Sequence, residues 1–274
     1  TSNISFRASY SEAFKAPTPY TTYNSLAVRT EDEEGNIGVD YWGIPNKNLE
    51  PEEFSAMELG GRFAITNKTH IEIIGFYNQI KGLITNTGHF KIDPAQFPYN
   101  TKEFAGGFVN NENAEGKIGG VDLIFSARNL IERINLNTNI SFRYAKGNED
   151  LPNGEHIDAY RMMPEKMAKI RCNAMPLNNL FVGLDFMYSD DWYARNISSK
   201  VDLEAGKISG YSIVDVVINY KIPFDKIQCL CFNLKINNLF DTGYAGIGAY
   251  GGPNDLQFNP QLGRIMYGGV TSAF

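Results

Sequence analysis

Three features that are absent or scarce limit the classes of protein to which this chain can belong. It has no run of about 18 or more apolar residues, so its 274 residues contain no candidate transmembrane helix. It has three cysteines, and Cys229 and Cys231 lie two apart while Cys172 is distant, which favours small structural residues over a disulfide framework or a redox site. It has three histidines, and no His or Cys spacing suits zinc, so we expect no metal site.

Further absences bear on catalysis and on partners. No glycine-rich loop precedes a helical pattern and no nucleophile stands beside a plausible base, so we expect neither a cofactor nor a catalytic residue. The net charge of -6 argues against nucleic acid as a partner. The acidic run from Glu31 to Glu34 is typical of a solvated loop, although it leaves a calcium site open.

What the chain has in abundance is alternation between apolar and polar residues. Aromatic residues make up 13% of the chain and there are 26 glycines, a profile that suits many strands and tight turns. Leu136, Ile140, Phe142 and Tyr144 alternate with polar residues such as Arg143, and successive side chains of a strand point to opposite faces. Such a strand fits a soluble β-sandwich, or an outer-membrane β-barrel whose apolar face meets lipid.

The connections decide between these two architectures. Ten strands are predicted, near residues 2–14, 53–66, 69–84, 116–128, 133–146, 165–176, 179–193, 209–223, 228–240 and 262–274. Long connections (15–52, 85–115, 147–164, 194–208 and 241–261) alternate with short ones near 67–68, 129–132, 177–178 and 224–227. Long loops at one end and short turns at the other are typical of outer-membrane barrels. The sequence therefore predicts an all-β, antiparallel up-and-down transmembrane β-barrel with both termini on the periplasmic side.

The two faces of the predicted strands agree with a barrel. Charged residues fall on the face opposite the apolar one, which we expect to line the lumen: Arg7, Glu58, Arg62, Asp122, Arg128, Arg143, Lys169, Arg171, Asp185, Asp215 and Lys235. Aromatic residues gather near both ends of the strands, as they do at the two membrane interfaces. The strand near 69–84 alternates least cleanly, because Ile71, Ile73, Ile74 and Phe76 are all apolar.

Several short motifs resemble the barrel of TonB-dependent outer-membrane receptors. Residues 14–17 (Phe-Lys-Ala-Pro) are similar to the family's Phe-Arg-Ala-Pro box. Residues 46–52 are similar to its Asn-Pro-Asn-Leu-x-Pro-Glu box, with Lys47 in place of the proline. Further matching pieces follow in the family's order: Glu58-Leu59-Gly60, residues 237–241, residues 260–264 and the terminal Phe274. The resemblance covers the whole chain.

The resemblance implies a piece of a larger barrel. Receptors of this kind have 22 strands around a plugged lumen, so about ten strands are fewer than half. We therefore expect residues 1–274 to be the C-terminal part of the barrel, without the plug domain and the N-terminal strands. Two unpaired edge strands would not be stable in lipid, which indicates the same. Because a strand already begins at the N-terminus, we expect a signal sequence and further chain before Thr1.

The resemblance also implies function and partners. The expected function is binding and active import of a scarce nutrient, such as an iron chelate (siderophore), haem or cobalamin, across the outer membrane of a Gram-negative bacterium. No histidine lies in residues 18–45, where haem receptors similar to this family carry one. Expected partners are the TonB-ExbB-ExbD energising complex, reached through the plug, the barrel-assembly machinery, which would read Phe274, and the lipid bilayer. A surface lipoprotein is left open as a partner.

Aromatic residues of the predicted external loops are the candidate substrate contacts. Aromatic side chains on loops above a rigid scaffold commonly form binding surfaces, and packing of loop against loop is their alternative role. The candidates are Tyr20, Tyr23, Tyr41, Trp42, Tyr99, Tyr193, Tyr244 and Tyr250.

Two other function classes stay open at this point. A complete ten-stranded outer-membrane enzyme would need an acid–base or nucleophile cluster at the outer rim, and His156 with Asp150 or Asp158 is the nearest candidate. A passive channel would need a closed barrel without a plug.

Overall fold

Within the described residues, ten strands of one main sheet follow each other in the order that the alternation predicts. The structure, a computed structural model, describes residues 3–23, 26–31, 37–44, 47–92, 104–111, 115–151, 154–194, 206–222, 229–246 and 260–273. The long strands are β1 (Ile4–Lys15), β4 (Glu52–Ala64), β5 (Thr69–Lys81), β8 (Gly116–Ala127), β9 (Asn137–Asp150), β11 (Lys166–Leu177), β12 (Leu180–Ser189), β15 (Tyr211–Ile222), β16 (Cys229–Asn237) and β17 (Ile265–Ala273).

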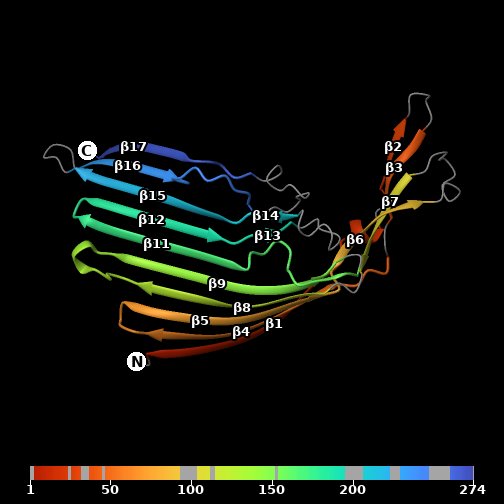
Figure 1. Cartoon of the computed structure of the whole chain (residues 1–274), viewed down its shortest axis with the longest axis horizontal. Coiled ribbons are helices and arrows are strands. Elements are labelled where there is room, and N and C mark those ends of the chain that lie inside the picture. Colours follow the sequence, from red (N-terminus) through yellow and green to blue (C-terminus); the bar gives the residue numbers. More distant parts are fainter. Residues whose placement is uncertain are drawn as a thin grey trace.

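These strands form one antiparallel meander. Each long strand pairs with the next one along the chain, and β10 (His156–Ile157) pairs with β9 as the eleventh strand of the sheet. Short connections (65–68, 128–136, 178–179 and 223–228) alternate with long ones. The N- and C-terminal ends lie at the same end of the sheet, and the long connections lie at the other (Figure 1). The predicted all-β, up-and-down arrangement is confirmed.

Strand register fixes which residues share a face. Val121 pairs with Tyr144 and Leu123 with Phe142, while the intervening Asp122 pairs with Arg143 on the opposite face. We call these the apolar face and the polar face. Residues directly opposite each other in a ladder point the same way. Ten of the eleven charged residues predicted for one face pair in ladders on the polar face, and Arg128, directly after β8, continues the same alternation.

The register also resolves the irregular strand β5. Ile71 and Ile73 pair with Phe125 and Leu123, and so lie on the apolar face. Ile74 and Phe76 belong to the polar face instead, although all four had been grouped together from sequence. Phe76 is accommodated there because the Arg143 guanidinium lies over its ring, 5.3 Å from the centroid.

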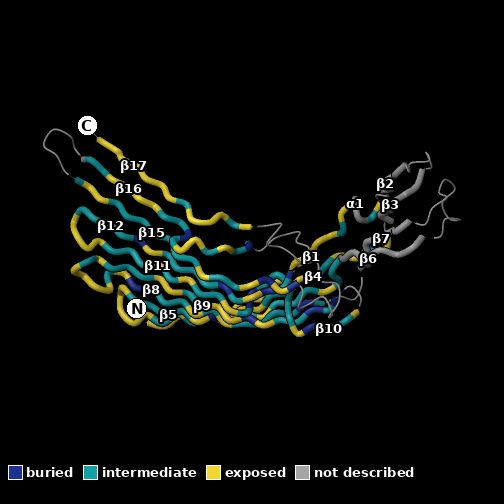
Figure 2. Tube along the Cα trace, turned by 45° about the horizontal axis from the view of Figure 1, so that its top comes forward, coloured by how far each residue is buried: buried dark blue, intermediate teal, exposed yellow. Residues whose placement is uncertain are grey.

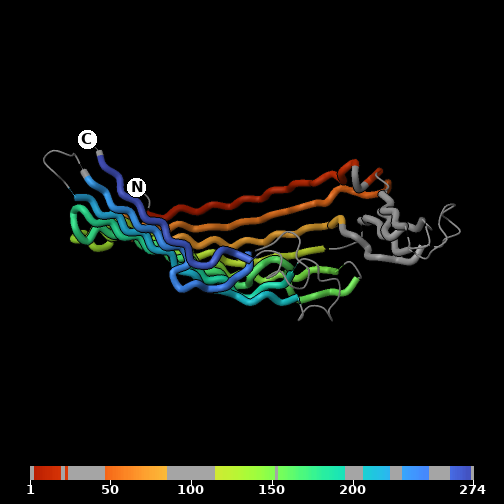
Figure 3. Tube along the Cα trace, turned by 90° about the horizontal axis from the view of Figure 1, so that it is seen from above, coloured from red at the N-terminus to blue at the C-terminus, as the bar shows by residue number. Residues whose placement is uncertain are grey.

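The sheet is open and its apolar face is uncovered. Within the described residues, β1 and β17 are the two ends of the strand order, and each pairs on one side only. Figure 3 shows both strands along the edges of a twisted sheet, and in Figure 2 most of β17 is coloured as exposed. On the apolar face Phe6 is 75% exposed, Leu59 66% and Val270 62%. A surface of this kind needs an apolar cover.

Smaller elements occupy the long connections, where the sequence predicted loops. Strands β2 (Leu26–Glu31), β3 (Ile37–Ile44), β7 (Phe104–Asn111) and β6 (Ile84–Ile92) form a separate four-stranded sheet. Strands β13 (Trp192–Tyr193) and β14 (Lys207–Ile208) form a short hairpin. Helical elements within the described residues are α1 (Pro19–Tyr23) and the 3-10 turn η2 (Glu132–Ile134). Among the described residues, no helix is long and apolar enough to cross a membrane.

The start of β9 corrects one prediction. The sequence placed residues 133–136 in a strand, with Leu136 on its apolar face. In the structure η2 occupies 132–134 and Asn135 follows it with φ of 47°, in the left-handed region. Asn tolerates this conformation better than most residues, so it ends the turn and the strand begins at Asn137.

Candidate functional site

Ion pairs line the polar face between neighbouring strands. Arg143 donates two hydrogen bonds to Asp122, both of 2.7 Å, and Arg171 donates one of 2.6 Å to Asp185. Their side chains stay 19% to 50% exposed, so we assign them little stability. They make this face a polar wall suited to water or to a polar ligand.

The connection 151–165, which we call the inward loop, folds over this wall. Glu149 on the polar face of β9 accepts hydrogen bonds of 3.1 and 3.0 Å from Arg161 Nε, and the two side chains are 6% and 12% exposed. Arg161 N also donates to Glu149 at 3.2 Å. Leu151, Ile157 and Pro164, at the two ends and in the middle of this connection, are fully buried. The ion pair and these buried residues fix the loop in place.

Glycines on the wall make room for the inward loop. A Cβ at Gly116 would lie 2.6 Å from Cε2 of Tyr160, and one at Gly147 would lie 2.9 Å from Cβ of Tyr160. Tyr160 therefore lies directly on the backbone of β8 and β9. Burial raises the pKa of the Tyr160 hydroxyl, and the Glu149 carboxylate raises it further.

An apolar cluster joins two more long connections. Trp192, Ala194, Ile208 and Ala245 are each at most 4% exposed and pack together, linking the β13–β14 hairpin to the connection after β16. The inward loop is tied to the same hairpin, because Met162 N donates to the Tyr193 carbonyl at 2.7 Å. Three long connections thus form one assembly, which we call the loop assembly.

Asp191 anchors the base of the hairpin. Its Oδ1 accepts a hydrogen bond of 2.6 Å from Gly210 N, and its Oδ2 lies 3.1 Å from Lys207 Nζ. The backbone hydrogen bond from Gly210 lowers the pKa of Asp191 below its ordinary value, and Lys207 lowers it further.

Residues of the sequence motifs hydrogen-bond to neighbouring segments at the same end of the sheet. Lys15 of the first box lies 2.9 Å from Glu52 of the second, and the other Glu52 oxygen accepts from Ile84 N at 2.9 Å. Asn238, which is 3% exposed and has φ of 52°, exchanges hydrogen bonds of 2.8 and 2.9 Å with Thr242. These motifs therefore fix strand ends where the long connections begin.

The candidate contact residues divide into three groups. Tyr23, at the end of α1, is 68% exposed, and Tyr193 is half-buried in the hairpin. The Tyr244 ring lies 4.5 Å from the ring of Tyr211 at the start of β15. The side chain of the expected assembly signal, Phe274, lies outside the described residues, as do those of the remaining candidates: Tyr20, Tyr41, Trp42, Tyr99 and Tyr250.

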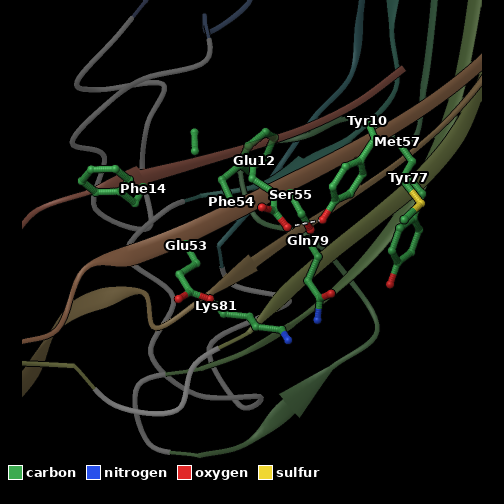
Figure 4. A pocket seen from close by; sticks show the side chains of 11 residues that line it. Tyr10, Glu12, Phe14, Glu53, Phe54, Ser55, Met57, Tyr77, Gln79 and Lys81 are labelled. Carbon is green, nitrogen blue, oxygen red and sulfur yellow. Dashed lines mark hydrogen bonds between the residues drawn. The ribbon is translucent and has the colours of Figure 1, made fainter. Parts of the chain in front are cut away.

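A large hollow lies on the opposite face from the loop assembly. It has a volume of about 510 Å³ and is lined at the outer ends of β1, β4 and β5 by side chains that include Tyr10, Glu12, Met57, Tyr77 and Gln79 (Figure 4). Their register places these five on the apolar face, above the uncovered apolar surface. This hollow is thus separate from the polar wall.

The histidine considered for an enzyme lies between two carboxylates. His156 Nδ1 is 2.8 Å from Asp150 Oδ1, and Nε2 is 3.8 Å from Asp158 Oδ1. Both ring nitrogens therefore face acidic groups, which is the geometry of an exposed ion pair. A general base for hydrolysis needs one nitrogen directed at a nucleophile or a water.

Comparison with known proteins identifies the family. Residues 1–239 match the family model of the TonB dependent receptor-like β-barrel. The chain belongs to the TonB-dependent receptors. In this family the barrels are outer-membrane proteins. In such barrels the apolar face meets lipid, the polar face lines the lumen and the long loops are external.

Solved structures of TonB-dependent receptors share this fold at low sequence identity. The ferric enterobactin receptor PfeA of Pseudomonas aeruginosa superposes with a TM-score of 0.66 at 15% identity, over 100% of this chain and 38% of that one. The ferric-catecholate import receptor Fiu of E. coli K12 gives 0.62 at 13% identity, over 99% and 33%. The copper transporter OprC gives 0.61 at 16%, over 99% and 37%. A search of curated protein sequences found no match.

The sequence did not predict the loop assembly. Glu149, Arg161, Tyr160 and Asp191 belong to no sequence motif, because each acts through a residue of another strand or connection. One usable signal was the presence of glycine on the polar face at 116 and 147, where a side chain would otherwise project into the lumen. The chain spans 33% to 39% of the solved receptors it resembles, and it is on this part that the loop assembly lies.

Proposed function

We propose that residues 1–274 are the C-terminal part of the barrel of a receptor that imports a metal or metal chelate across the outer membrane of a Gram-negative bacterium. The plug and the N-terminal strands would belong to the rest of that receptor. Ferric siderophores are the preferred substrates, followed by haem and cobalamin. The named structural relatives are receptors for ferric enterobactin and ferric catecholates and a copper transporter, which supports this order.

The loop assembly is the observation that carries this proposal. Three external connections are held together by the Trp192 cluster and held to the lumen wall by the Glu149–Arg161 pair. A fixed surface at the mouth can receive a ligand without first ordering its own loops, which saves conformational entropy on binding. A polar wall directly below the mouth offers a wet path for a polar ligand.

Ligand contacts and partners follow from this position. We assign ligand contact to Tyr20, Tyr23, Tyr41, Trp42, Tyr99, Tyr193, Tyr244 and Tyr250, and an assembly signal to Phe274. Receptors of this family work with the TonB energising system. For this receptor we infer contact with TonB-ExbB-ExbD through the plug, insertion by the barrel-assembly machinery, and room for a surface lipoprotein.

The test is equilibrium binding to the purified full-length receptor, using ferric enterobactin, haem and cobalamin as separate probes. We expect saturable binding of the ferric chelate and weaker binding to Tyr23→Ala. The Tyr23 side chain is exposed, so its removal takes away a proposed ligand contact rather than buried packing. Tyr144→Ala is the matched control, since Tyr144 lies on the apolar face. If none of the three probes binds saturably, the import function is wrong. Equal binding by both variants would remove Tyr23 from the site.

A further inference from the structure

One residue of the inward loop has an unfavourable backbone conformation. Among the residues that the structure describes, five other than glycine have a positive φ: Asn129, Asn135, Met162, Asn238 and Asp241. Four of these are Asn or Asp, whose short polar side chains tolerate the left-handed region. Met162, with φ of 64°, has no such side chain, so its conformation has to be imposed by the contacts around it.

Contacts on both sides of Met162 impose this conformation. On the wall side, Arg161 N donates to the Glu149 carboxylate at 3.2 Å, and Arg161 Nε donates to it at 3.0 and 3.1 Å. On the other side Pro164 is fully buried, and the residue before a proline avoids the helical region. Between these fixed points, Met162 N donates to the Tyr193 carbonyl at 2.7 Å. The loop is therefore held at three points around a residue that would relax if it were released.

The Tyr193 carbonyl is itself held by the β13–β14 hairpin. Tyr193 lies at the end of β13, between Trp192 and Ala194, which are both buried. Ala194 N donates to the Gly206 carbonyl at 2.9 Å and so continues the pairing of β13 with β14. A shift of the hairpin would thus remove the partner of the Met162 N–H, and a shift of the loop would uncover the Tyr193 carbonyl.

From these contacts we propose that residues 160–164, which we call the latch, switch between a closed state and an open state. The closed state is the one in the structure, and the strain at Met162 raises its free energy relative to the open state. In the open state Met162 returns to a negative φ and releases the Tyr193 carbonyl, and Tyr160 leaves the backbone of β8 and β9. Latch and hairpin open together, because each is held by the other. This coupling transmits movement of the external hairpin to the lumen wall, whatever the receptor imports.

Hydrogen exchange in the purified full-length receptor tests the strain through two substitutions at one position. Met162→Ala and Met162→Gly both remove the half-buried side chain, but only glycine adopts a positive φ without strain. Exchange is read by mass spectrometry with fragmentation that resolves single amides, and is corrected for intrinsic rates. We expect the residue 162 amide to exchange roughly fivefold or more slowly in Met162→Gly than in Met162→Ala, which is the usual left-handed penalty of an L-residue. The Ala194 amide should slow in parallel, because the hairpin opens with the latch.

Met163 supplies the matched control, because it is also half-buried and its φ is not positive. There glycine only adds freedom to the open state, so Met163→Gly should exchange as fast as Met163→Ala or faster. Equal exchange of the two Met162 variants, or slower exchange of the glycine variant at both positions, would overturn the strain. Slower exchange of the residue 162 amide with an unchanged Ala194 amide would overturn the joint opening of latch and hairpin.

Discussion

Replacing Arg161 with leucine should release the inward loop from the lumen wall. The substitution leaves the Glu149 carboxylate, whose side chain is 6% exposed, without its partner. Removing one member of a buried ion pair typically costs about 3–5 kcal/mol. If the loop opens locally to relieve this cost, amide exchange in residues 154–163 should accelerate by roughly 100-fold or more, since about 1.4 kcal/mol is a factor of ten.

Hydrogen exchange read by mass spectrometry on the full-length receptor measures this effect. The most informative amide is Met162 N–H, which donates to the Tyr193 carbonyl at 2.7 Å and ties the loop to the hairpin. Lys166→Leu is the matched control. It removes an exposed ion pair with Asp190, of 3.6 Å, which is worth about 1 kcal/mol or less. Unchanged exchange in Arg161→Leu, or an equal change in Lys166→Leu, would refute the role given to the buried pair.

Three further predictions concern the external end of the barrel. Trp192→Ala should destabilise the loop assembly by about 3–5 kcal/mol, because it empties the buried cluster, and proteolysis between β12 and β15 should accelerate while the barrel strands stay protected. The folded pKa of Asp191 lies below its ordinary 3.8, so its anchoring of the hairpin should persist above that value and disappear as pH falls through the lower folded pKa. Amide exchange rates of the hairpin, corrected for the intrinsic effect of pH, should show this loss. Asp191→Asn should abolish the pH dependence. Asn238→Ala should lower the free energy of unfolding in urea by about 2–4 kcal/mol, because it removes two hydrogen bonds and places alanine at a positive φ. Asn238→Gly should recover part of this loss, since glycine adopts a positive φ without strain. Equal losses in the two variants would show that the backbone conformation contributes nothing.

The strands could be predicted from sequence because their signal is local. Alternation along residues such as Ile140, Phe142 and Tyr144 reports the environment of each face directly, and all ten long strands were found. The alternation left the facing of Ile74 and Phe76 open, because both lie among apolar residues, and their place on the polar face follows only from the pairing of β5 with β8.

The site was predictable to a smaller extent. The motif boxes were recognised, but the ion pair between Lys15 and Glu52 that joins them follows only from the β1–β4 register. The inward loop depends on Tyr160 meeting the backbone at Gly147, which no local pattern encodes. Strands within the long connections were missed for the same reason: their partners are other connections, as in the pairing of β3 with β7.

Energised uptake tests the central claim most directly. Cells that express the full-length receptor would be given a radiolabelled ferric catecholate, with and without a protonophore that collapses the energy supply of the TonB system. We predict that the chelate binds at the surface in both cases and accumulates inside only in energised cells. Accumulation that continues at the same rate without energy would show a passive channel and would contradict the account.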